Sequence, residues 1–169
     1  MSTKSTIVAL PGYCSIDIDA DLNVNEDAKL GEGGTATIYK CTFKKMSLIT
    51  KYKFNEVAVK VIKTDDETTI NLIKFEIAIM SSINPHPNVI LFVGYSESPI
   101  AIVMKYYSMS LKDTLKQFSF AGSDVHLFKI AFDISAGMAH IHQSGVLHLD
   151  LKPRKNICRP KSQVYNLLW

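Results

Sequence analysis

Apolar and polar residues alternate along several short stretches of this chain, which is the period of a half-buried β-strand. β-Branched residues are concentrated in the same stretches, as the pleated surface of a sheet favours. The β-like pattern becomes clear from Ala28 onward. The stretches predicted as strands are 35–39, 56–62, 89–94 and 100–106.

The apolar period changes to that of a helix at 68–82. A Pro-x-Pro segment follows and ends this helix, because proline lacks the backbone donor that a helix interior requires. A short helix is predicted at 111–117 and a longer one at 124–143, closed by Ser-Gly at 144–145. Strands with one helix, followed mostly by helices, predict an α+β fold in two parts.

Composition narrows the class of protein only a little. The chain has 169 residues and is 47% hydrophobic, enough for one core or two small lobes. A net charge of +3 gives no argument for nucleic acid or a membrane surface, and the longest apolar run, near 89–93, is too short for a membrane span. Cysteines 14, 41 and 158 show no metal or disulfide spacing, so a reducing, cytoplasmic location is expected.

One glycine-rich segment approximates the Gly-x-Gly-x-x-Gly pattern of phosphate-binding loops. It reads Leu30-Gly31-Glu32-Gly33-Gly34-Thr35-Ala36, with Ala36 in the last place. Glycines let backbone N–H groups approach phosphate oxygens, but they also form ordinary hairpin turns, and for a lone match the turn is the better interpretation. The next residues favour a strand, whereas a dinucleotide-binding loop needs a helix there, and no Gly-Lys-Ser/Thr of a Walker loop is present.

A lysine on an apolar strand is the second candidate. In Val57-Ala58-Val59-Lys60, alternation places Ala58 and Lys60 on one face, where alanine leaves room for a flat ring and lysine reaches phosphates. The alternative interpretation of Lys60 is a lysine at the end of a strand that merely extends its ammonium to solvent. Glu76 favours the functional interpretation, because a carboxylate in an otherwise apolar helix needs a partner if it faces inward. An ion pair between Lys60 and Glu76 is therefore predicted.

The third candidate segment follows the long helix and reads His148-Leu149-Asp150-Leu151-Lys152-Pro153-Arg154-Lys155-Asn156. A loop aspartate can accept the proton of a substrate hydroxyl, and the lysine two positions later can neutralise charge on a transferring phosphoryl group. An asparagine can bind a metal through its amide oxygen. A lone aspartate is more often a turn or cap residue, but this string of residue types is hard to produce by accident.

Together these segments resemble the protein kinases, and most closely the serine/threonine kinases of the tyrosine-kinase-like group. The resemblance extends from about 25 to 156. Its motifs are Leu-Gly-Glu-Gly-Gly-Thr-Ala-Thr-Ile-Tyr-Lys, Val-Ala-Val-Lys, Phe-Glu-Ile-Ala-Ile-Met, His-Pro-Asn-Val-Ile and His-Leu-Asp-Leu-Lys-Pro. The combination is highly specific, although the glycine loop by itself is not.

The resemblance implies ATP and Mg²⁺ as cofactors. It implies that Leu30 and Ile38 sandwich adenine together with Ala58, while the glycine loop covers the phosphates. It implies a gatekeeper side chain and a hinge whose backbone bonds the adenine edge; these residues are Met104 for the gatekeeper and Lys105, Tyr106 and Tyr107 for the hinge.

The resemblance also implies the catalytic residues. Asp150 would be the catalytic base, and Lys60 with Glu76 would position the phosphates. Lys152, in an Asp-Leu-Lys-Pro context, implies a protein substrate phosphorylated on Ser or Thr rather than Tyr. Asn156 is the candidate Mg²⁺ ligand.

In the family's terms the chain divides into four expected parts. Residues 1–22 form a leader or linker, and 23–107 form a complete β-rich N-lobe with one helix and the hinge. Residues 108–156 form the first part of a helical C-lobe, up to the catalytic loop. Residues 157–169 do not resemble the family and are expected to be an unrelated or frameshifted tail.

The chain departs from the family pattern at several positions. Leu149 replaces the usual arginine before the catalytic aspartate, so control through a phosphorylated activation loop is not expected. Lys155 holds the place of the metal-binding asparagine; either one residue is inserted before Asn156 or the ligand is lost, and the apolar residue after Asn156 favours insertion. No Asp or Glu follows Asp150, so the Asp-Phe-Gly motif, which supplies the main Mg²⁺ ligand, is absent.

Three interpretations follow. The first is ATP-dependent phosphoryl transfer to protein Ser or Thr. The second is a non-catalytic, pseudokinase-like module that binds nucleotide or competes for partners. The third is an inactive truncated product, which the abrupt loss of resemblance after Asn156 favours over a tailored pseudokinase. In a truncated chain, the apolar surface of the long helix around Phe128 would promote aggregation.

Overall fold

The structure is a computed structural model that describes residues 9–117, 124–152, 156–158 and 165–167. The chain separates into two compact units, and each is considered by itself. The first unit comprises Met1–Ser82 and Phe92–Tyr106, and the second comprises Ile83–Leu91 and Tyr107–Trp169. Both strands and helices are present, so the predicted α+β class is confirmed.

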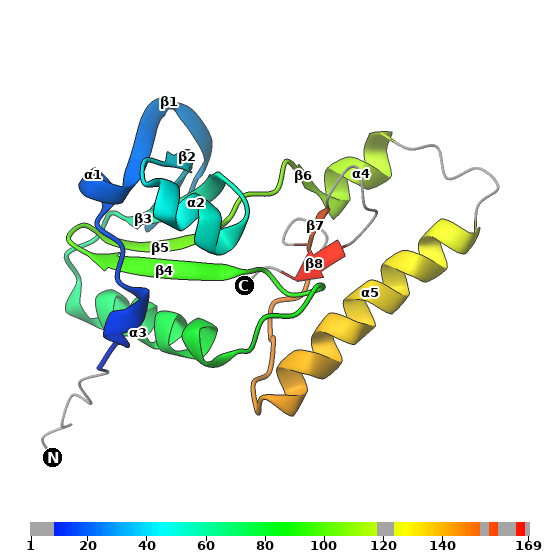
Figure 1. The fold of residues 1–169 in the computed structure, drawn as a ribbon. Helices are drawn as coiled ribbons and strands as arrows, with labels where there is room; N and C mark the ends of the chain where they lie inside the picture. Colours follow the sequence, from blue (N-terminus) through cyan, green and yellow to red (C-terminus); the bar gives the residue numbers. More distant parts are fainter. Residues whose placement is uncertain (1–8, 118–123, 153–155, 159–164, 168–169) are drawn as a thin grey trace, which may run out of the picture. The chain divides into compact units, whose positions relative to one another are not determined.

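The first unit contains, within its described residues, a five-stranded antiparallel sheet in the order β1-β2-β3-β5-β4 (Figure 1). Strand β3 carries the predicted alternation, with Val57 and Val59 buried on one face and Ala58 and Lys60 on the other. The strands are β1 Leu22–Glu32, β2 Ala36–Phe43, β3 Glu56–Ile62, β4 Phe92–Glu97 and β5 Ile100–Lys105.

Two helices flank this sheet on opposite faces (Figure 1). Helix α2, Met46–Tyr52, packs Leu48 and Ile49 against the core on the valine face of β3. Helix α3, Glu67–Ser82, lies on the Lys60 face, where its residues Ile77 and Met80 are buried. The valine face therefore forms the main core, whereas on the opposite face α3 buries apolar side chains and leaves Lys60 half-buried.

Helix α2 was not predicted from the sequence. It ends at Lys53, which adopts the left-handed conformation with φ of 59° and donates its N–H to Ile49. Three aromatic rings hold it to the sheet, with centroid separations of 5.7–6.0 Å among Phe43, Tyr52 and Phe54. The helix depends on this packing, because a seven-residue helix is marginal by itself.

The prediction of a leader at 1–22 needs correction. Within this segment the structure describes a 3₁₀ turn, Gly12–Cys14, and helix α1, Ile18–Asp21. Leu22 is 1% exposed and packs in the same core as Ile16 and Ile18, which are also buried. The described residues of the segment, from position 9, are thus part of the first unit rather than a linker.

The second unit is built around helix α5, Asp124–Gln143, which has the predicted bounds. Val89 packs in its core against Ile141, which is fully buried. The predicted strand at 89–94 is therefore displaced: β4 starts at Phe92, and residues before it belong to a buried loop. The other elements are helix α4, Leu111–Gln117, and strands β6 Met109–Ser110, β7 Asn156–Cys158 and β8 Tyr165–Leu167, which form a sheet in the order β6-β7-β8.

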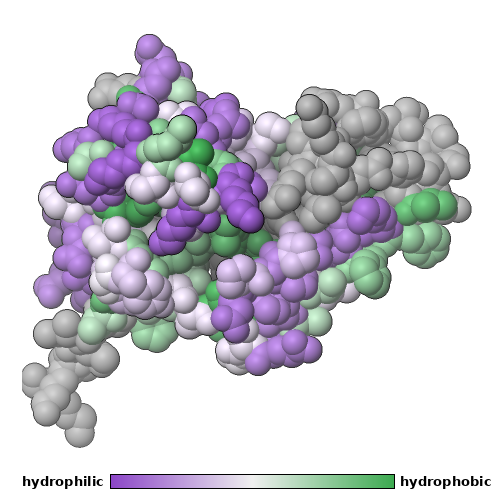
Figure 2. Space-filling model, viewed as in Figure 1, coloured by the Kyte–Doolittle hydropathy of each residue, from purple (hydrophilic) through white to green (hydrophobic). Residues whose placement is uncertain are grey.

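Helix α5 carries apolar side chains on its exposed side as well as on its buried side. Figure 2 shows hydrophobic surface along one edge of the helix. Of its apolar side chains, Val125, Phe128 and Phe132 are 72–75% exposed. Ile130, by contrast, is buried against Leu111, so only part of the apolar surface noted in the sequence is uncovered within this unit. No helix in the part of the chain that the structure describes is long and apolar enough to cross a membrane.

Candidate functional site

The predicted pair between Lys60 and Glu76 is present in the first unit. The Nζ of Lys60 lies 2.8 Å from Oε1 and 2.9 Å from Oε2 of Glu76, so both carboxylate oxygens accept from one ammonium. The side chains are 24% and 26% exposed, which leaves the pair half-buried at the edge of solvent. The helix thereby fixes the direction of a cation that protrudes from the middle of the sheet.

The sheet register brings Ile38 and Met104, two of the residues expected around the nucleotide, onto the same face as Ala58 and Lys60. Ile38 pairs directly with Lys60 across β2 and β3, and Met104 pairs with Ala58 across β3 and β5. Paired residues in an antiparallel sheet point to the same face, so these side chains form one surface. Leu30 lies in β1, next to Gly31, which pairs with Ile38.

The segment expected to be the hinge begins with Lys105, the last residue of β5, which pairs with Val57 of β3. The N–H of Tyr106 donates to the carbonyl of Glu56 at 3.2 Å, so this donor is committed to the sheet rather than to a ligand. Lys40 approaches the Tyr106 ring at 4.5 Å and binds the Glu56 carboxylate at 2.5 Å. The hydrogen bond from Lys40 to Glu56 is the main cause of the raised pKa of Lys40. These contacts fasten the start of the segment to β3; Tyr107 belongs to the second unit.

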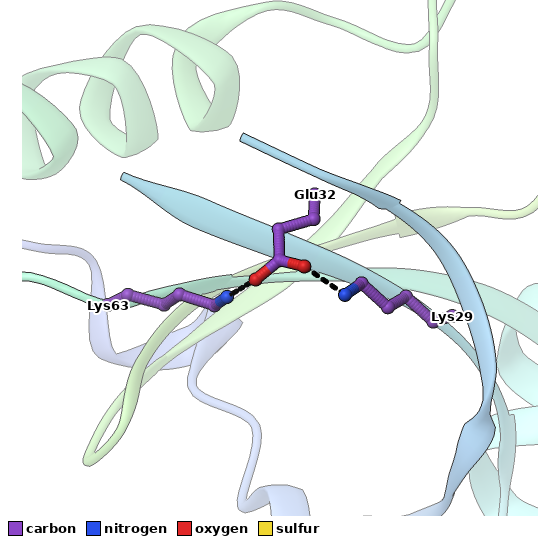
Figure 3. Close-up of polar contacts among 3 residues, drawn as sticks. All are labelled: Lys29, Glu32 and Lys63. Atoms are coloured by element: carbon purple, nitrogen blue, oxygen red, sulfur yellow. Dashed lines mark hydrogen bonds and ion pairs between the residues drawn. The ribbon is translucent and has the colours of Figure 1, made fainter. Parts of the chain in front are cut away.

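Glu32 is the last residue of β1, directly before the glycine turn, and was expected among the nucleotide-binding residues. Its carboxylate instead accepts hydrogen bonds from Lys29 and from Lys63, as Figure 3 shows. These bonds are the main cause of its lowered pKa, about 2. Gly33 and Gly34 form the tip of the turn, and a Cβ placed on either would meet no atom closer than 3.8 Å.

The second unit contains the residues of the expected catalytic segment. Lys152 lies 2.9 Å from the carboxylate of Asp150, and both side chains are about half exposed, at 49% and 55%. The backbone N–H of Asp150 donates to Nδ1 of buried His148 at 3.3 Å. Leu149, which stands where the family has arginine, is 90% exposed. The structure therefore brings the side chains of Asp150 and Lys152 together.

The expected metal ligand is less completely described. Asn156 begins β7 and pairs with Leu167 of β8, but its side chain lies outside the described residues. Among the side chains that the structure does describe, no three His, Cys, Asp or Glu residues gather as a metal site. The described side chains therefore offer no such set of ligands for Mg²⁺, and no chemical step is assigned to the metal.

Sequence reasoning missed two groups of residues that hold the site in place. Lys29 and Lys63 bind Glu32, and Glu56 binds the start of the hinge segment. The position of Lys63 could have been predicted, because Lys63 directly follows β3 and therefore lies near the glycine turn once β2 and β3 are paired. Glu56 acts through its backbone carbonyl, and this role could not be predicted because it does not depend on the type of side chain.

Comparison with known proteins agrees with this geometry. A family model described as protein tyrosine and serine/threonine kinase matches residues 24–164. The match continues past Asn156, where the motifs had placed the end of the resemblance.

Several curated kinases are also similar. A probable serine/threonine-protein kinase of Dictyostelium discoideum is 28% identical over 86% of this chain and 11% of its own length. A putative serine/threonine-protein kinase/receptor of Acanthamoeba polyphaga mimivirus is 35% identical over 73% of this chain and 7% of its own. The dual specificity protein kinase shkB of Dictyostelium discoideum is 31% identical over 79% of this chain and 20% of its own.

The chain thus spans a fifth or less of the length of these relatives. The family match nevertheless covers most of the chain, including the glycine loop, the Lys60–Glu76 pair and the Asp150 segment. On this evidence the chain belongs to the protein tyrosine and serine/threonine kinase family.

Proposed function

We propose that this chain binds ATP and transfers its γ-phosphoryl group to a Ser or Thr hydroxyl of a protein. The observation that carries the proposal is the ion pair of Lys60 with Glu76, at 2.8 and 2.9 Å, on the sheet face that also bears Ile38, Ala58 and Met104. A cation held in one direction beside a flat apolar surface suits a ligand that joins a ring to a chain of phosphates.

The proposed roles in the first unit concern binding. Ala58 and Ile38 offer an apolar surface to adenine, and the small side chain of Ala58 leaves the space for the ring. Lys60 binds phosphate oxygens while Glu76 keeps its ammonium from turning away. A Cβ at Gly34, at the tip of the loop, would meet nothing within 4 Å, so a phosphate can approach the backbone there, whereas the N–H of Gly33 already donates to Ala36.

The proposed roles in the second unit concern transfer. Asp150 accepts the proton of the substrate hydroxyl, whose oxygen forms a bond to the γ-phosphorus as the bond to the β–γ bridging oxygen breaks and ADP leaves. Lys152, which lies 2.9 Å from Asp150, offsets the negative charge of the transferring group. The Asp-Leu-Lys-Pro context supports Ser or Thr as the acceptor.

A second candidate is a module that binds nucleotide without transferring phosphate. Two residues favour it: Leu149 stands in place of the arginine, and Lys155 stands five positions after Asp150, where the family has a metal-binding asparagine. A lysine ammonium has no lone pair to offer a cation, so transfer would require Asn156 to replace that ligand.

The experiment measures two activities of the purified chain with and without Mg²⁺. Binding is followed with a fluorescent ATP analogue, and transfer with γ-labelled ATP and a mixed protein substrate, whose labelled amino acids are then identified. Lys60→Met is expected to weaken binding about tenfold or more, because the phosphates lose a directed cation. Asp150→Asn is expected to retain binding and to lose transfer.

The outcomes separate the candidates. Binding with transfer to Ser or Thr that both variants abolish supports phosphoryl transfer. Binding that Lys60→Met removes, with no transfer by any form, supports the non-catalytic module. An absence of binding in the parent chain, or equal transfer by the chain and both variants, contradicts the proposal.

A further inference from the structure

The glycine loop is held from two sides by charge. Figure 3 shows the Glu32 carboxylate between Lys29 and Lys63, with Oε2 accepting from Lys29 and Oε1 from Lys63. Lys29 belongs to β1 itself, whereas Lys63 follows β3 and lies 31 positions away in the chain. The carboxylate therefore connects the end of β1, at the glycine turn, to the residue that follows β3.

Lys63 also holds the other side of the turn through its backbone. Its N–H donates to the carbonyl of Thr35 at 2.9 Å, next to the paired residues Ala36 and Ile62. Lys63 thus contacts the residue before the glycine tip with its side chain and the residue after the tip with its main chain. Within the tip itself, Gly33 donates to Ala36 at 2.8 Å.

Packing contributes little to the position of this loop. A Cβ added at Gly31 or Gly34 would meet no atom within 4 Å, and at Gly33 it would meet only the Ala36 carbonyl, at 3.8 Å. Leu30, the nearest large apolar side chain before the turn, is 46% exposed. With so few close side-chain neighbours, the loop is held by the β1–β2 pairing at its base, by the N–H of Gly33 to Ala36, and by the contacts that Glu32 and Lys63 make.

The charges are suited to holding a loop rather than to stabilising the fold. The side chains of Lys29, Glu32 and Lys63 are 39–45% exposed, and exposed ion pairs contribute little to folding stability. A small bias is nevertheless enough to shift a loop whose alternative positions differ little in energy. The hydrogen bonds from Lys29 and Lys63 lower the pKa of Glu32 to about 2, so the carboxylate stays charged at neutral pH.

The sign of the cluster also matters for a phosphate ligand. An unpaired carboxylate beside a triphosphate would repel it, whereas Glu32 with Lys29 and Lys63 leaves one net positive charge at the end of the loop. The arrangement thus keeps an acidic residue in the loop without opposing the phosphates.

We propose that Glu32 is a positioning residue: by binding Lys63 and Lys29 it holds the glycine loop closed over the nucleotide phosphates, and it does not contact the nucleotide itself. The nucleotide part of this inference rests on the proposed function. The hold on the loop does not, so the two parts are tested separately.

The first test is hydrogen exchange of the loop amides, residues 31–36, in the full chain without nucleotide. Glu32→Gln keeps the shape of the side chain and removes both ion pairs, and we expect exchange to rise about three- to tenfold, the combined effect of losing two weak surface ion pairs. Lys63→Gln should raise it in the same direction, and the double variant should exchange no faster than Glu32→Gln. Lys129→Gln, which breaks an ion pair with Asp133 on α5, is the matched control and should leave the loop unchanged.

Salt provides a second control for the same measurement. At about 1 M salt the ion pairs are screened, so exchange in the parent chain should approach that of Glu32→Gln, while the variant itself changes little. If Glu32→Gln leaves the exchange of residues 31–36 as it is in the parent chain, the proposed hold on the loop is overturned.

The second test is the dissociation rate of a fluorescent ATP analogue. Glu32→Gln is expected to raise this rate about three- to tenfold, because a loosened loop releases the phosphates sooner. A faster loop exchange with an unchanged dissociation rate overturns the positioning role. If the parent chain binds no nucleotide, the proposed function fails, while the exchange experiment still decides whether Glu32 holds the loop.

Discussion

Lys60 and Glu76 lie 16 positions apart and meet with both carboxylate oxygens within 2.9 Å of one ammonium. The contact joins β3 to α3 on the face of the sheet opposite the main core. Because each side chain is about a quarter exposed, the pair is neither a weak surface contact nor a fully buried one. It is therefore sensitive to the loss of either partner.

Glu76→Gln should cost about 1–2 kcal/mol of unfolding free energy, between the values of exposed and buried pairs, because a half-buried ammonium loses its counter-charge. Urea denaturation measures this cost, and the fluorescent ATP analogue should bind more weakly to the variant. Adding Lys60→Gln should cost less than the sum of the two single changes, since both remove one interaction. Additive losses would show that the two side chains act independently.

Gly94→Ala should release the N-terminal segment from β4. A Cβ at this position would lie 2.2 Å from the Cys14 carbonyl oxygen and 2.7 Å from Ile16, so the backbone of one segment has to move. We expect a loss of about 1–3 kcal/mol in urea unfolding, typical of overpacking, and faster proteolysis before residue 18.

The matched control is Gly12→Ala, because a Cβ at Gly12 meets nothing within 4 Å. It should leave both the stability and the proteolysis pattern close to those of the parent chain. Equal behaviour of the two variants would contradict the docking of this segment on β4.

The second unit should lose stability as the pH falls below about 6.5, through His86. Burial, and then the charge of His140, lower the pKa of His86 in the folded chain. The rings stack at 4.6 Å, Nδ1 of His86 accepts from the N–H of Asn88 at 3.1 Å, and Nε2 of His140 donates to the carbonyl of Asn84 at 2.8 Å. Protonation of His86 thus adds charge beside His140 and removes the acceptor of Asn88.

The direction in which pH changes the stability follows from proton binding at His86. At a pH between the pKa of His86 in the folded chain and its higher pKa in the unfolded chain, the unfolded chain binds more protons at this residue. The stability that neutral His86 contributes is therefore complete above the unfolded pKa and is lost as the pH falls. Urea unfolding at pH 7.5 and 5.5 should show a smaller pH-dependent loss for His86→Gln than for the parent chain. The same loss in both would assign the pH dependence to other groups.

Phe128→Lys with Phe132→Lys should reduce self-association of the chain. Both rings are more than 70% exposed on α5, so replacing them removes apolar surface without opening a cavity. Sedimentation or light scattering should show a larger monomer fraction with nearly unchanged stability.

Ile130→Ala is the contrasting change on the same helix, because Ile130 is 7% exposed and packs against Leu111. It should cost about 2–4 kcal/mol and leave association undiminished. A parent chain whose association is insensitive to the Phe128 and Phe132 changes would show that this apolar strip is not the contacting surface.

Several elements could be predicted from local pattern. The bounds of β3, α4 and α5 agree with those predicted, since alternation or helical period continues without interruption to a clear end. Strand β1, Leu22–Glu32, was not among the predicted strands, and its β-like pattern was recognised only from Ala28, because its register with β2 shifts around Lys29 and the alternation is broken there.

Other features depend on residues far along the chain. The apolar run that includes Val89 has the composition of a strand, but it is a buried loop because Ile141 provides a core for it. Ile16 and Leu22 are not distinguishable from linker residues until the sheet that covers them is present.

The sequence by itself determined the family, the α+β class and the pairing of Lys60 with Glu76, because a charge in an apolar helix requires an opposite charge and the motifs offer Lys60. Only the tertiary structure decided where Glu32 is directed. An exposed carboxylate has many possible partners, and only the pairing of β2 with β3 brings Lys63 beside the glycine turn.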